Sequence, residues 1–209
     1  MNQLDFLSMI VKEKILPELL EHPSIPDEII VAFEPLTIET TGGDRDTSES
    51  ITGTLLLKRM ADQFIDGKTI DVFTEKYEKP RAFIDGEEVS VSFSHTSDAI
   101  VAAISTSLNV GIDMESTERT VHERLASRMK SKEENSRIYS NHPLIRVWTF
   151  KEAALKMIGT GLRKPMNQVT VSVDKKDLFN AEFDDGNRAK ICSFIHQEHW
   201  ISICYKSLP

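Results

Sequence analysis

The sequence predicts an α+β fold of two pseudo-symmetric subdomains, each a long helix packed on a small antiparallel sheet. In each half of the chain, a stretch with apolar residues at helical spacing is accompanied by short apolar runs that turn signals separate. The two patterns meet near residue 109. We therefore expect an N-terminal subdomain over residues 1–108 and a C-terminal subdomain over residues 109–209, although no internal repeat is strong enough to demonstrate duplication.

The N-terminal half is expected to contain two helices. Apolar residues lie near helical spacing over residues 3–21 and predict an amphipathic helix. Residues 37–50 are polar and rich in Gly, Asp and Thr, which is typical of an exposed loop that orders over a ligand. Ser50 is placed to cap a second helix, which runs to Ile65. The strands expected in this half are residues 29–33, 70–73, 82–84, 89–93 and 100–105.

The C-terminal half begins with an apolar run over residues 109–115, which predicts a strand. A charged helix or helices should follow over residues 118–139. Residues 145–158 have a strong helical pattern and predict a further helix. The basic residues between 119 and 132 are expected to form a solvated helix face. The later strands are expected at residues 169–173, 181–183, 190–195 and 200–205.

The charge balance limits the kinds of partner. Among 209 residues, 25 Lys and Arg stand against 33 Asp and Glu, for a formal charge of −8. This balance argues against nonspecific binding of nucleic acid or anionic membranes, so an anionic ligand needs a local pocket. No apolar run approaches the roughly 18 residues of a transmembrane helix, and charged residues lie near the N-terminus where a signal peptide is apolar. We expect a cytoplasmic protein.

The two cysteines are interpreted as small core residues. Cys192 and Cys204 both lie in apolar strand-like runs, where an unpaired thiol usually packs as a hydrophobe. A zinc site of Cys192 with His196 and His199 is rejected, because these residues alternate across a predicted hairpin and lack a fourth ligand. The sequence predicts neither a disulfide nor a nucleophilic cysteine.

Two acidic residues end the predicted strand at residues 109–115. Asp113 and Glu115 are at positions i and i+2, so their side chains share one face of the strand, about 7 Å apart. Taken alone, this pair has a simpler interpretation as a solvated strand end. Its spacing also lets both carboxylates reach one cation.

An acid and two lysines lie on the predicted helix at residues 145–158. Positions i, i+4 and i+8 place Trp148, Glu152 and Lys156 along one stripe, with Lys151 on the neighbouring flank. Trp148 is expected to pack, and Glu152 with Lys156 is by itself an ordinary exposed ion pair. Three carboxylates and two lysines together suit a metal-bound, phosphate-rich ligand.

These motifs together resemble the 4′-phosphopantetheinyl transferases, in particular the monomeric type that activates nonribosomal peptide and polyketide synthases such as surfactin synthetase. Each motif alone is weak, but their order and spacing are specific. The resemblance covers roughly residues 46–170. Its pieces are Tyr77-Glu78-Lys79-Pro80, Phe93-Ser94-His95-Thr96, Gly111-Ile112-Asp113-Met114-Glu115, Arg128-Met129-Lys130-Ser131-Lys132-Glu133-Glu134, Trp148-Thr149-Phe150-Lys151-Glu152-Ala153 with Lys156, and Gly159-Thr160-Gly161-Leu162.

The resemblance implies transfer of phosphopantetheine from coenzyme A to a serine of an acyl or peptidyl carrier protein, with release of adenosine 3′,5′-bisphosphate. It implies that Mg²⁺, or Mn²⁺ in its place, bridges the pyrophosphate and is held by Asp113, Glu115 and Glu152. Asp113, Glu152 and Lys156 are the implied catalytic residues. Glu152 would take the serine proton, and Lys156 would stabilise or protonate the leaving phosphate.

The resemblance also implies contacts to coenzyme A. Ser94 and His95 look like phosphate contacts, Lys79 like a nucleotide-side contact, and Lys151 and Lys156 like pyrophosphate contacts. Two departures from the family pattern concern this ligand. The chain has Glu78 where the family usually has Gly, and Glu49 where it commonly has a basic residue before the second long helix; both acids repel a bisphosphorylated ligand.

The chain is long enough to supply both halves, so a monomer is expected. The carrier is expected to dock after the catalytic helix, where Leu162 and Met166 offer apolar contact and Arg163 and Lys164 offer charge. Two other functions use the same residues. One is a noncatalytic coenzyme A-binding module, which Glu78 and Glu49 favour; the other is a metal-dependent pyrophosphate hydrolase.

Overall fold

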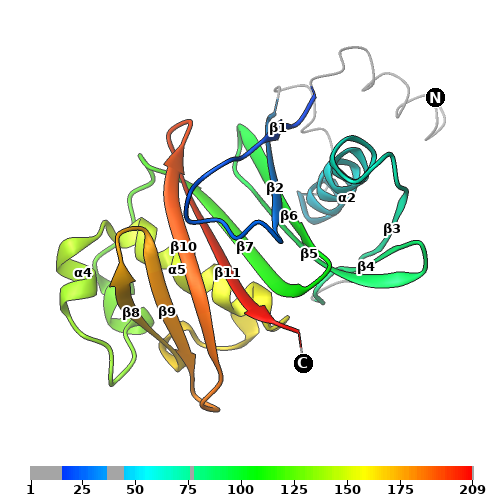
Figure 1. The fold of residues 1–209 in the computed structure, drawn as a ribbon. Coiled ribbons are helices and arrows are strands. Elements are labelled where there is room, and N and C mark those ends of the chain that lie inside the picture. The colour runs from blue at the N-terminus through cyan, green and yellow to red at the C-terminus, as the bar shows by residue number, and fades with distance from the viewer. Residues whose placement is uncertain (1–15, 37–44, 76–77, 209) are drawn as a thin grey trace.

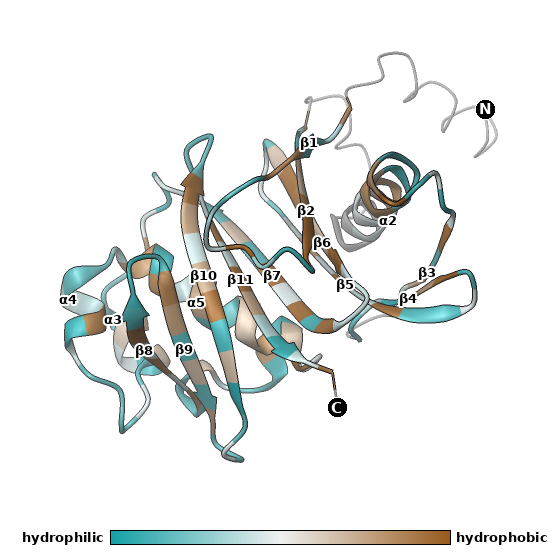
Figure 2. Ribbon diagram, viewed as in Figure 1, coloured by the Kyte–Doolittle hydropathy of each residue, from teal (hydrophilic) through white to brown (hydrophobic). Residues whose placement is uncertain are grey.

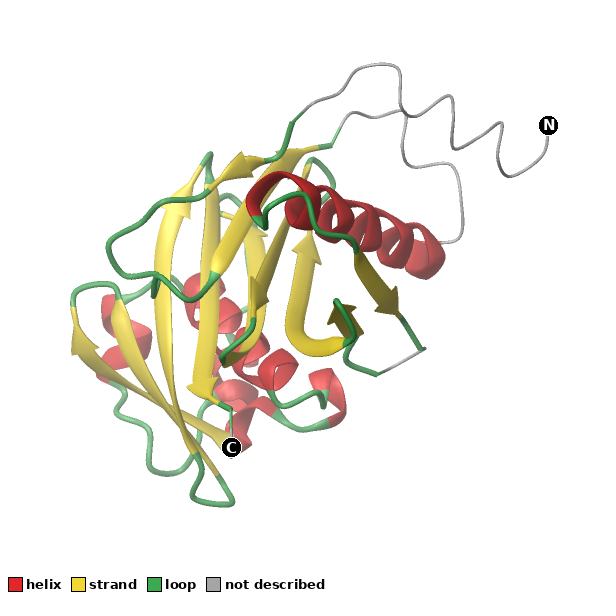
Figure 3. Cartoon of the chain, turned by 45° about the vertical axis from the view of Figure 1, so that its right-hand side comes forward, coloured by secondary structure: helices red, strands yellow, loops and turns green. Residues whose placement is uncertain are grey.

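The structure is a computed structural model that describes residues 16–36, 45–75 and 78–208. Two antiparallel sheets lie side by side, with one long helix on each (Figures 1 and 3). Helix α2 covers the first sheet, and helix α5 covers the second (Figure 1). The predicted α+β class, with a helix on a small sheet in each half, is confirmed.

The first sheet has six strands in the order β1-β2-β6-β5-β4-β3. Helix α2 (Arg45–Phe64) buries Leu56, Leu57 and Met60 against it. Gly53 is essential to this contact, since a Cβ atom there would lie 2.5 Å from the ring of Phe93. The strands are β1 (Glu18–Leu19), β2 (Ile30–Pro35), β3 (Ile70–Phe73), β4 (Arg81–Ile84), β5 (Glu87–His95) and β6 (Ala99–Ser105).

The second sheet has five strands in the order β7-β11-β10-β9-β8. Helix α5 (Leu144–Met157) lies directly on strand β7 (Leu108–Ser116). A Cβ at Gly111 would lie 2.2 Å from the carbonyl oxygen of Ala153, so only glycine permits this approach. The remaining elements are α3 (Arg124–Met129), α4 (Arg137–Asn141), η2 (Gly161–Arg163), η3 (Met166–Gln168), β8 (Val169–Lys175), β9 (Leu178–Phe183), β10 (Arg188–His196) and β11 (His199–Ser207).

Apolar residues from both sheets form a shared core between them. Val31 and Val101 of the first sheet pack in one cluster with Ile112 and Ile203 of the second. Figure 2 shows the corresponding hydrophobic stretches on β2, β6, β10 and β11. The two halves are therefore joined by buried apolar surface, which fixes strand β7 beside strand β5.

Alternate serines of β5 satisfy the free edge of β7. Strand β7 is an edge strand of its sheet, so some of its backbone groups lack a strand partner. The backbone N–H of Val110 donates to Ser90 Oγ at 3.0 Å, and that of Ile112 donates to Ser92 Oγ at 3.1 Å. This register brings Ser94, the next serine on the same face, to Asp113.

Two of the predicted N-terminal elements are wrong in part. Residues 3–15 of the predicted helix lie outside the described residues, but residues 16–21 are not helical and contain strand β1 instead. Pro17 has no N–H to donate within a helix, which explains why the helical pattern is not realised there. Ser50 does not cap the second helix, because α2 begins at Arg45 and passes through Ser50.

The other predicted elements correspond to observed ones within a few residues. The charged segment at residues 118–139 contains the two short helices α3 and α4. Cys192 and Cys204 are buried and free, as predicted. The chain passes from the first sheet to the second between Ser105 and Leu108, whereas the division into subdomains at residue 109 stays a prediction. Within the described ranges, no helix is both long and apolar enough to cross a bilayer.

Candidate active site

Three elements bring an acid, a lysine and a serine into one cluster. Asp113 comes from β7, Lys156 from α5 and Ser94 from the end of β5. The ammonium of Lys156 donates to Asp113 Oδ1 at 2.7 Å and to Ser94 Oγ at 2.9 Å. Ser94 Oγ in turn donates to Asp113 Oδ1 at 2.9 Å. The sequence interpretation predicted a site role for all three residues, and the structure places them together.

Two carboxylate oxygens beside this cluster accept no hydrogen bond from any residue that the structure describes. Asp113 Oδ2 and Glu152 Oε2 are both buried and unpaired among the described residues. Buried carboxylate oxygens without a partner are costly and uncommon. Because Glu152 lies one helical turn before Lys156, its carboxylate faces the same cluster. The two oxygens therefore have unused capacity for a cation.

Burial and mutual repulsion shift the pKa values of the acids in this cluster. Burial and, after it, the charges of Asp113 and Glu115 raise the pKa of Glu152 to about 7, although the charge of Lys156 acts in the opposite direction. Burial also raises the pKa of Glu115, and the charge of Asp113 adds to this. Three carboxylates thus repel one another here, and the ammonium of Lys156 and the guanidinium of Arg119 offset part of this repulsion.

Glu115 forms an ion pair with Arg119. Its Oε1 accepts a hydrogen bond from the guanidinium of Arg119, which also lies 5.9 Å from the ring centroid of Trp148. As they stand, no three His, Cys, Asp or Glu side chains in the described part of the chain form a group able to hold a metal ion. The two unpaired oxygens of Asp113 and Glu152 nevertheless fit a hard divalent cation, because such ions prefer oxygen ligands.

Lys79 lies at a junction apart from this cluster. Its ammonium donates to Asn109 Oδ1 at 2.5 Å, Val110 O at 2.7 Å, Ser90 Oγ at 3.2 Å and Met157 O at 3.2 Å. Burial lowers its pKa to about 8. Because these acceptors take all the ammonium hydrogens, none is free for a nucleotide, and Lys79 clamps the end of α5 to β5 and β7.

The structure does not place Lys151 at the phosphate side of the helix. Its side chain is fully buried, and its ammonium donates to Glu134 Oε2 at 2.8 Å. Three backbone carbonyl oxygens take part as well, those of Met129, Val169 and Met166 at 2.6, 2.7 and 3.4 Å. The predicted pyrophosphate contact is corrected on this ground: the ammonium group is enclosed and its donors are occupied.

The remaining predicted residues are divided between the site and its surroundings. His95 is half-buried at the end of β5, next to Ser94, and strand alternation points the two side chains to opposite faces. Leu162 is exposed in η2, as an apolar docking contact requires, but Met166 is buried and offers none. Glu78 is exposed, whereas the side chain of Glu49 lies outside the described residues.

The sequence interpretation did not identify two features that help to build the site. The first is the pair Ser90 and Ser92, which alternate on β5 with the predicted Ser94; this spacing is a signal that one strand face is polar and meets another backbone. Arg119 was assigned to a solvated helix face, but it precedes α3 and pairs with Glu115, four residues earlier. That spacing is the signal that could have identified it.

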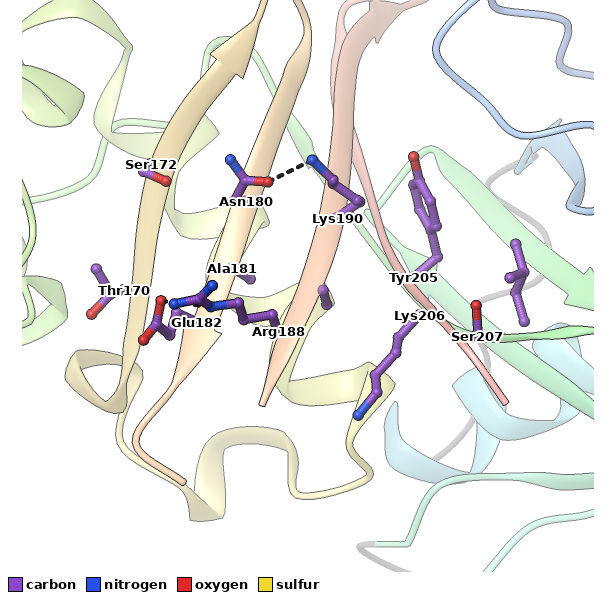
Figure 4. A pocket seen from close by; sticks show the side chains of 12 residues that line it. Thr170, Ser172, Asn180, Ala181, Glu182, Arg188, Lys190, Tyr205, Lys206 and Ser207 are labelled. Atoms are coloured by element: carbon purple, nitrogen blue, oxygen red, sulfur yellow. Dashed lines mark hydrogen bonds and ion pairs between the residues drawn. The ribbon is translucent and has the colours of Figure 1, made fainter. Parts of the chain in front are cut away.

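A hollow of about 660 Å³ lies elsewhere, on the five-stranded sheet (Figure 4). Strands β8 to β11 line most of it, and Lys190 donates to Asn180 Oδ1 there at 2.7 Å. Two of its basic residues are in ion pairs, Lys190 with Asp174 and Arg188 with Glu182. The third, Lys206, donates to Asn187 Oδ1 at 2.7 Å. The hollow contains none of the predicted site residues.

Comparison with known proteins identifies the family. A family model described as the 4′-phosphopantetheinyl transferase superfamily matches residues 109–204, which contain all three clustered carboxylates and Lys156. This is the superfamily that the sequence motifs resemble, and the match covers most of the C-terminal half of the chain. It is also 27% identical over 180 residues to "4′-phosphopantetheinyl transferase gsp" of Aneurinibacillus migulanus, an alignment that covers 76% of this chain and 74% of that protein. The resemblance seen in the sequence is confirmed, and the chain is an enzyme of the phosphopantetheinyl transferase class.

Proposed function

We propose that this chain transfers the 4′-phosphopantetheine group of coenzyme A to a serine hydroxyl of an acyl or peptidyl carrier protein, with Mg²⁺ as the metal and Mn²⁺ as a substitute. One observation carries the proposal: Asp113 Oδ2 and Glu152 Oε2 are buried beside the ammonium of Lys156, and neither has a hydrogen-bond partner in the part of the chain that the structure describes. Unsatisfied acids next to a cation are suited to a ligand that brings both a metal ion and phosphates.

Asp113 and Glu152 would hold the metal, with Glu115 as the third acid once it leaves Arg119. When bound, the ion would neutralise charge on the pyrophosphate during transfer. The protein's own contribution is to hold these acids in a shielded site, where electrostatic interactions are stronger than in water.

The reaction exchanges one phosphorus–oxygen bond for another. The carrier serine oxygen forms a bond to the phosphorus that bears pantetheine, and the bond from that phosphorus to the bridging oxygen breaks. The bridging oxygen leaves with adenosine 3′,5′-bisphosphate. Lys156 is placed to stabilise this leaving phosphate, since its ammonium already lies between Asp113 and Ser94.

Glu152 is the proposed acceptor of the serine proton. Burial and neighbouring acids raise its pKa to about 7 in the metal-free protein, and a bound cation would lower that pKa. The metal would therefore also have to position the serine hydroxyl and lower the pKa of that hydroxyl. Ser94 would contact the phosphates from the end of β5, whereas His95 lies on the opposite face of the strand and is given no phosphate contact in this proposal. Lys79 and Lys151 have structural roles in this proposal, because protein acceptors occupy their ammonium groups.

One chain supplies both sheets, both long helices and the whole acid cluster, which supports the proposal that the enzyme acts as a monomer. Carrier docking is proposed around the exposed Leu162, next to the end of α5. Light scattering coupled to size exclusion checks the first point, since a dimer mass would contradict it.

The direct experiment mixes the protein with coenzyme A, Mg²⁺ and several apo carrier proteins, and then weighs the carriers by mass spectrometry. We expect a phosphopantetheine-sized gain on at least one carrier, an equal release of adenosine 3′,5′-bisphosphate, and no gain when the carrier serine is replaced by alanine or when EDTA is present. Turnover of coenzyme A without a carrier would indicate a hydrolase. Binding of coenzyme A with no turnover would indicate a noncatalytic module.

A further inference from the structure

Arg119 lies between solvent and the acid cluster. It follows strand β7, four residues after Glu115, and its guanidinium donates to the Glu115 carboxylate. The same guanidinium lies over the ring of Trp148, 5.9 Å from its centroid, which is within the range of a cation–π contact. Trp148 is one helical turn before Glu152 on α5. The arginine is therefore held from two sides next to the clustered acids.

The two members of the Glu115–Arg119 ion pair differ in how far their side chains are buried. The side chain of Glu115 is 14% exposed, whereas that of Arg119 is 51% exposed. A mostly buried acid thus takes its counter-charge from an arginine that reaches in from the surface. Glu115 Oε1 already accepts a hydrogen bond from Arg119. Asp113 and Glu152, in contrast, each have one buried oxygen without a partner among the described residues.

We propose that Arg119 is a built-in competitor of the divalent cation for Glu115 and so lowers the metal affinity of the site. The inference rests on the proposed function. Arg119 holds Oε1 of Glu115, so a metal ion can take that oxygen only if the guanidinium moves away. The positive charge of the guanidinium also opposes the approach of a cation to the rest of the carboxylate. The ring of Trp148 offers the displaced guanidinium a place close by.

If Arg119 has this role, its removal should raise the metal affinity by a modest factor. Exposed ion pairs are weak, so removing Arg119 should tighten Mn²⁺ binding by about threefold, and the loss of one positive charge acts in the same direction. Arg119→Lys keeps a charge but loses the planar fork, and we expect an affinity between those of the wild type and Arg119→Ala.

The test is a titration of the whole protein with Mn²⁺, with free ion measured by electron paramagnetic resonance and Mg²⁺ added as a competitor. Arg188→Ala is the matched control, because it also removes an exposed arginine from an ion pair, at 3.1 Å from Glu182 on the second sheet. We expect tighter Mn²⁺ binding for Arg119→Ala and an unchanged affinity for Arg188→Ala. Thermal unfolding checks that both variants remain folded.

The outcomes separate this inference from the proposed function. If the wild type binds Mn²⁺ and Arg119→Ala binds it equally or more weakly, Arg119 does not compete, while the metal site itself stands. If neither protein binds Mn²⁺, the proposed metal site and the role of Arg119 are both rejected. Binding by Arg119→Ala alone would be the strongest support.

Discussion

Helix α5 carries two lysine–acid clusters that differ in how completely they are satisfied. Lys151 is enclosed with Glu134, whose Oε2 also accepts from Tyr139 at 2.6 Å and whose Oε1 accepts from the backbone N–H of Val171 at 2.7 Å. Lys156, five residues later, pairs with Asp113, but Asp113 Oδ2 and the nearby Glu152 Oε2 have no hydrogen-bond partner in the described ranges of the chain. The same residue types thus form a closed structural cluster on one side of the helix and an open one on the other.

The difference teaches how to separate structural from functional charges. A buried ion pair with all its hydrogen-bonding groups satisfied holds segments together: Lys151 and Glu134 join α5 to the end of α3 and to the start of β8. A buried acid with a free oxygen costs stability, and such a cost is typical of sites that wait for a ligand.

Breaking the closed cluster should have the largest effect. Lys151→Met leaves the carboxylate of Glu134 buried without its cation, and we expect a loss of about 3 to 5 kcal/mol in the free energy of unfolding. Urea denaturation at pH 7 measures it. Lys156→Met is the matched control on the same helix and should cost less, because the Lys156 side chain is partly exposed.

The double variant Lys151→Met with Glu134→Gln sharpens this point. It removes both charges, so it should recover part of the stability that the single variant loses. An equal loss in the single and double variants would show that packing, not the ion pair, stabilises this region.

Changing the open cluster should affect activity rather than folding. Glu152→Gln keeps the size of the side chain but removes a metal ligand and the proposed base, so we expect carrier modification to fall at least about 100-fold. Mass spectrometry of a carrier accepted by the wild type gives the rate, and circular dichroism checks the fold. Near wild-type turnover would reject the role assigned to Glu152.

The same residue gives a smaller effect on stability that depends on pH. The pKa of Glu152 rises from 4.5 to about 7 on folding, so between these values the folded chain holds a proton that the unfolded chain has lost. Stability from this group is therefore complete below pH 4.5 and is lost as the pH rises through 7.

In EDTA, Glu152→Gln should therefore gain about 1 to 3 kcal/mol relative to the wild type when the pH is raised from 5 to 8. Urea unfolding of both proteins at the two pH values provides the comparison. A difference between them that stays constant with pH would mean that Glu152 is not held at a raised pKa.

Much of the open cluster could be predicted from the sequence, because it depends on regular spacing. The i, i+2 rule placed Asp113 with Glu115, and the i, i+4 rule placed Glu152 with Lys156. Most strands were predictable for the same reason. The close approach of strand β7 to helix α5 depends on Gly111, because a Cβ atom at this position would push the two elements apart.

The errors came from contacts between distant segments. Lys151 lies beside Glu152 in the sequence, and only the position of Glu134, 17 residues away, shows that it is enclosed. Lys79 lay in a family-like motif, but its acceptors come from β5, β7 and the end of α5. Side-chain partners at long range are not encoded in a local pattern, so sequence spacing alone cannot tell a clamp from a ligand contact.

A crystal structure of the protein with Mg²⁺ and coenzyme A tests the central claim most directly. The account predicts one ion bound to both Asp113 Oδ2 and Glu152 Oε2 at about 2.0 to 2.1 Å, with the pyrophosphate completing its coordination and Lys151 still enclosed by Glu134. A coenzyme A pyrophosphate bound away from these two oxygens, or contacted by Lys151 in place of Lys156, would contradict it.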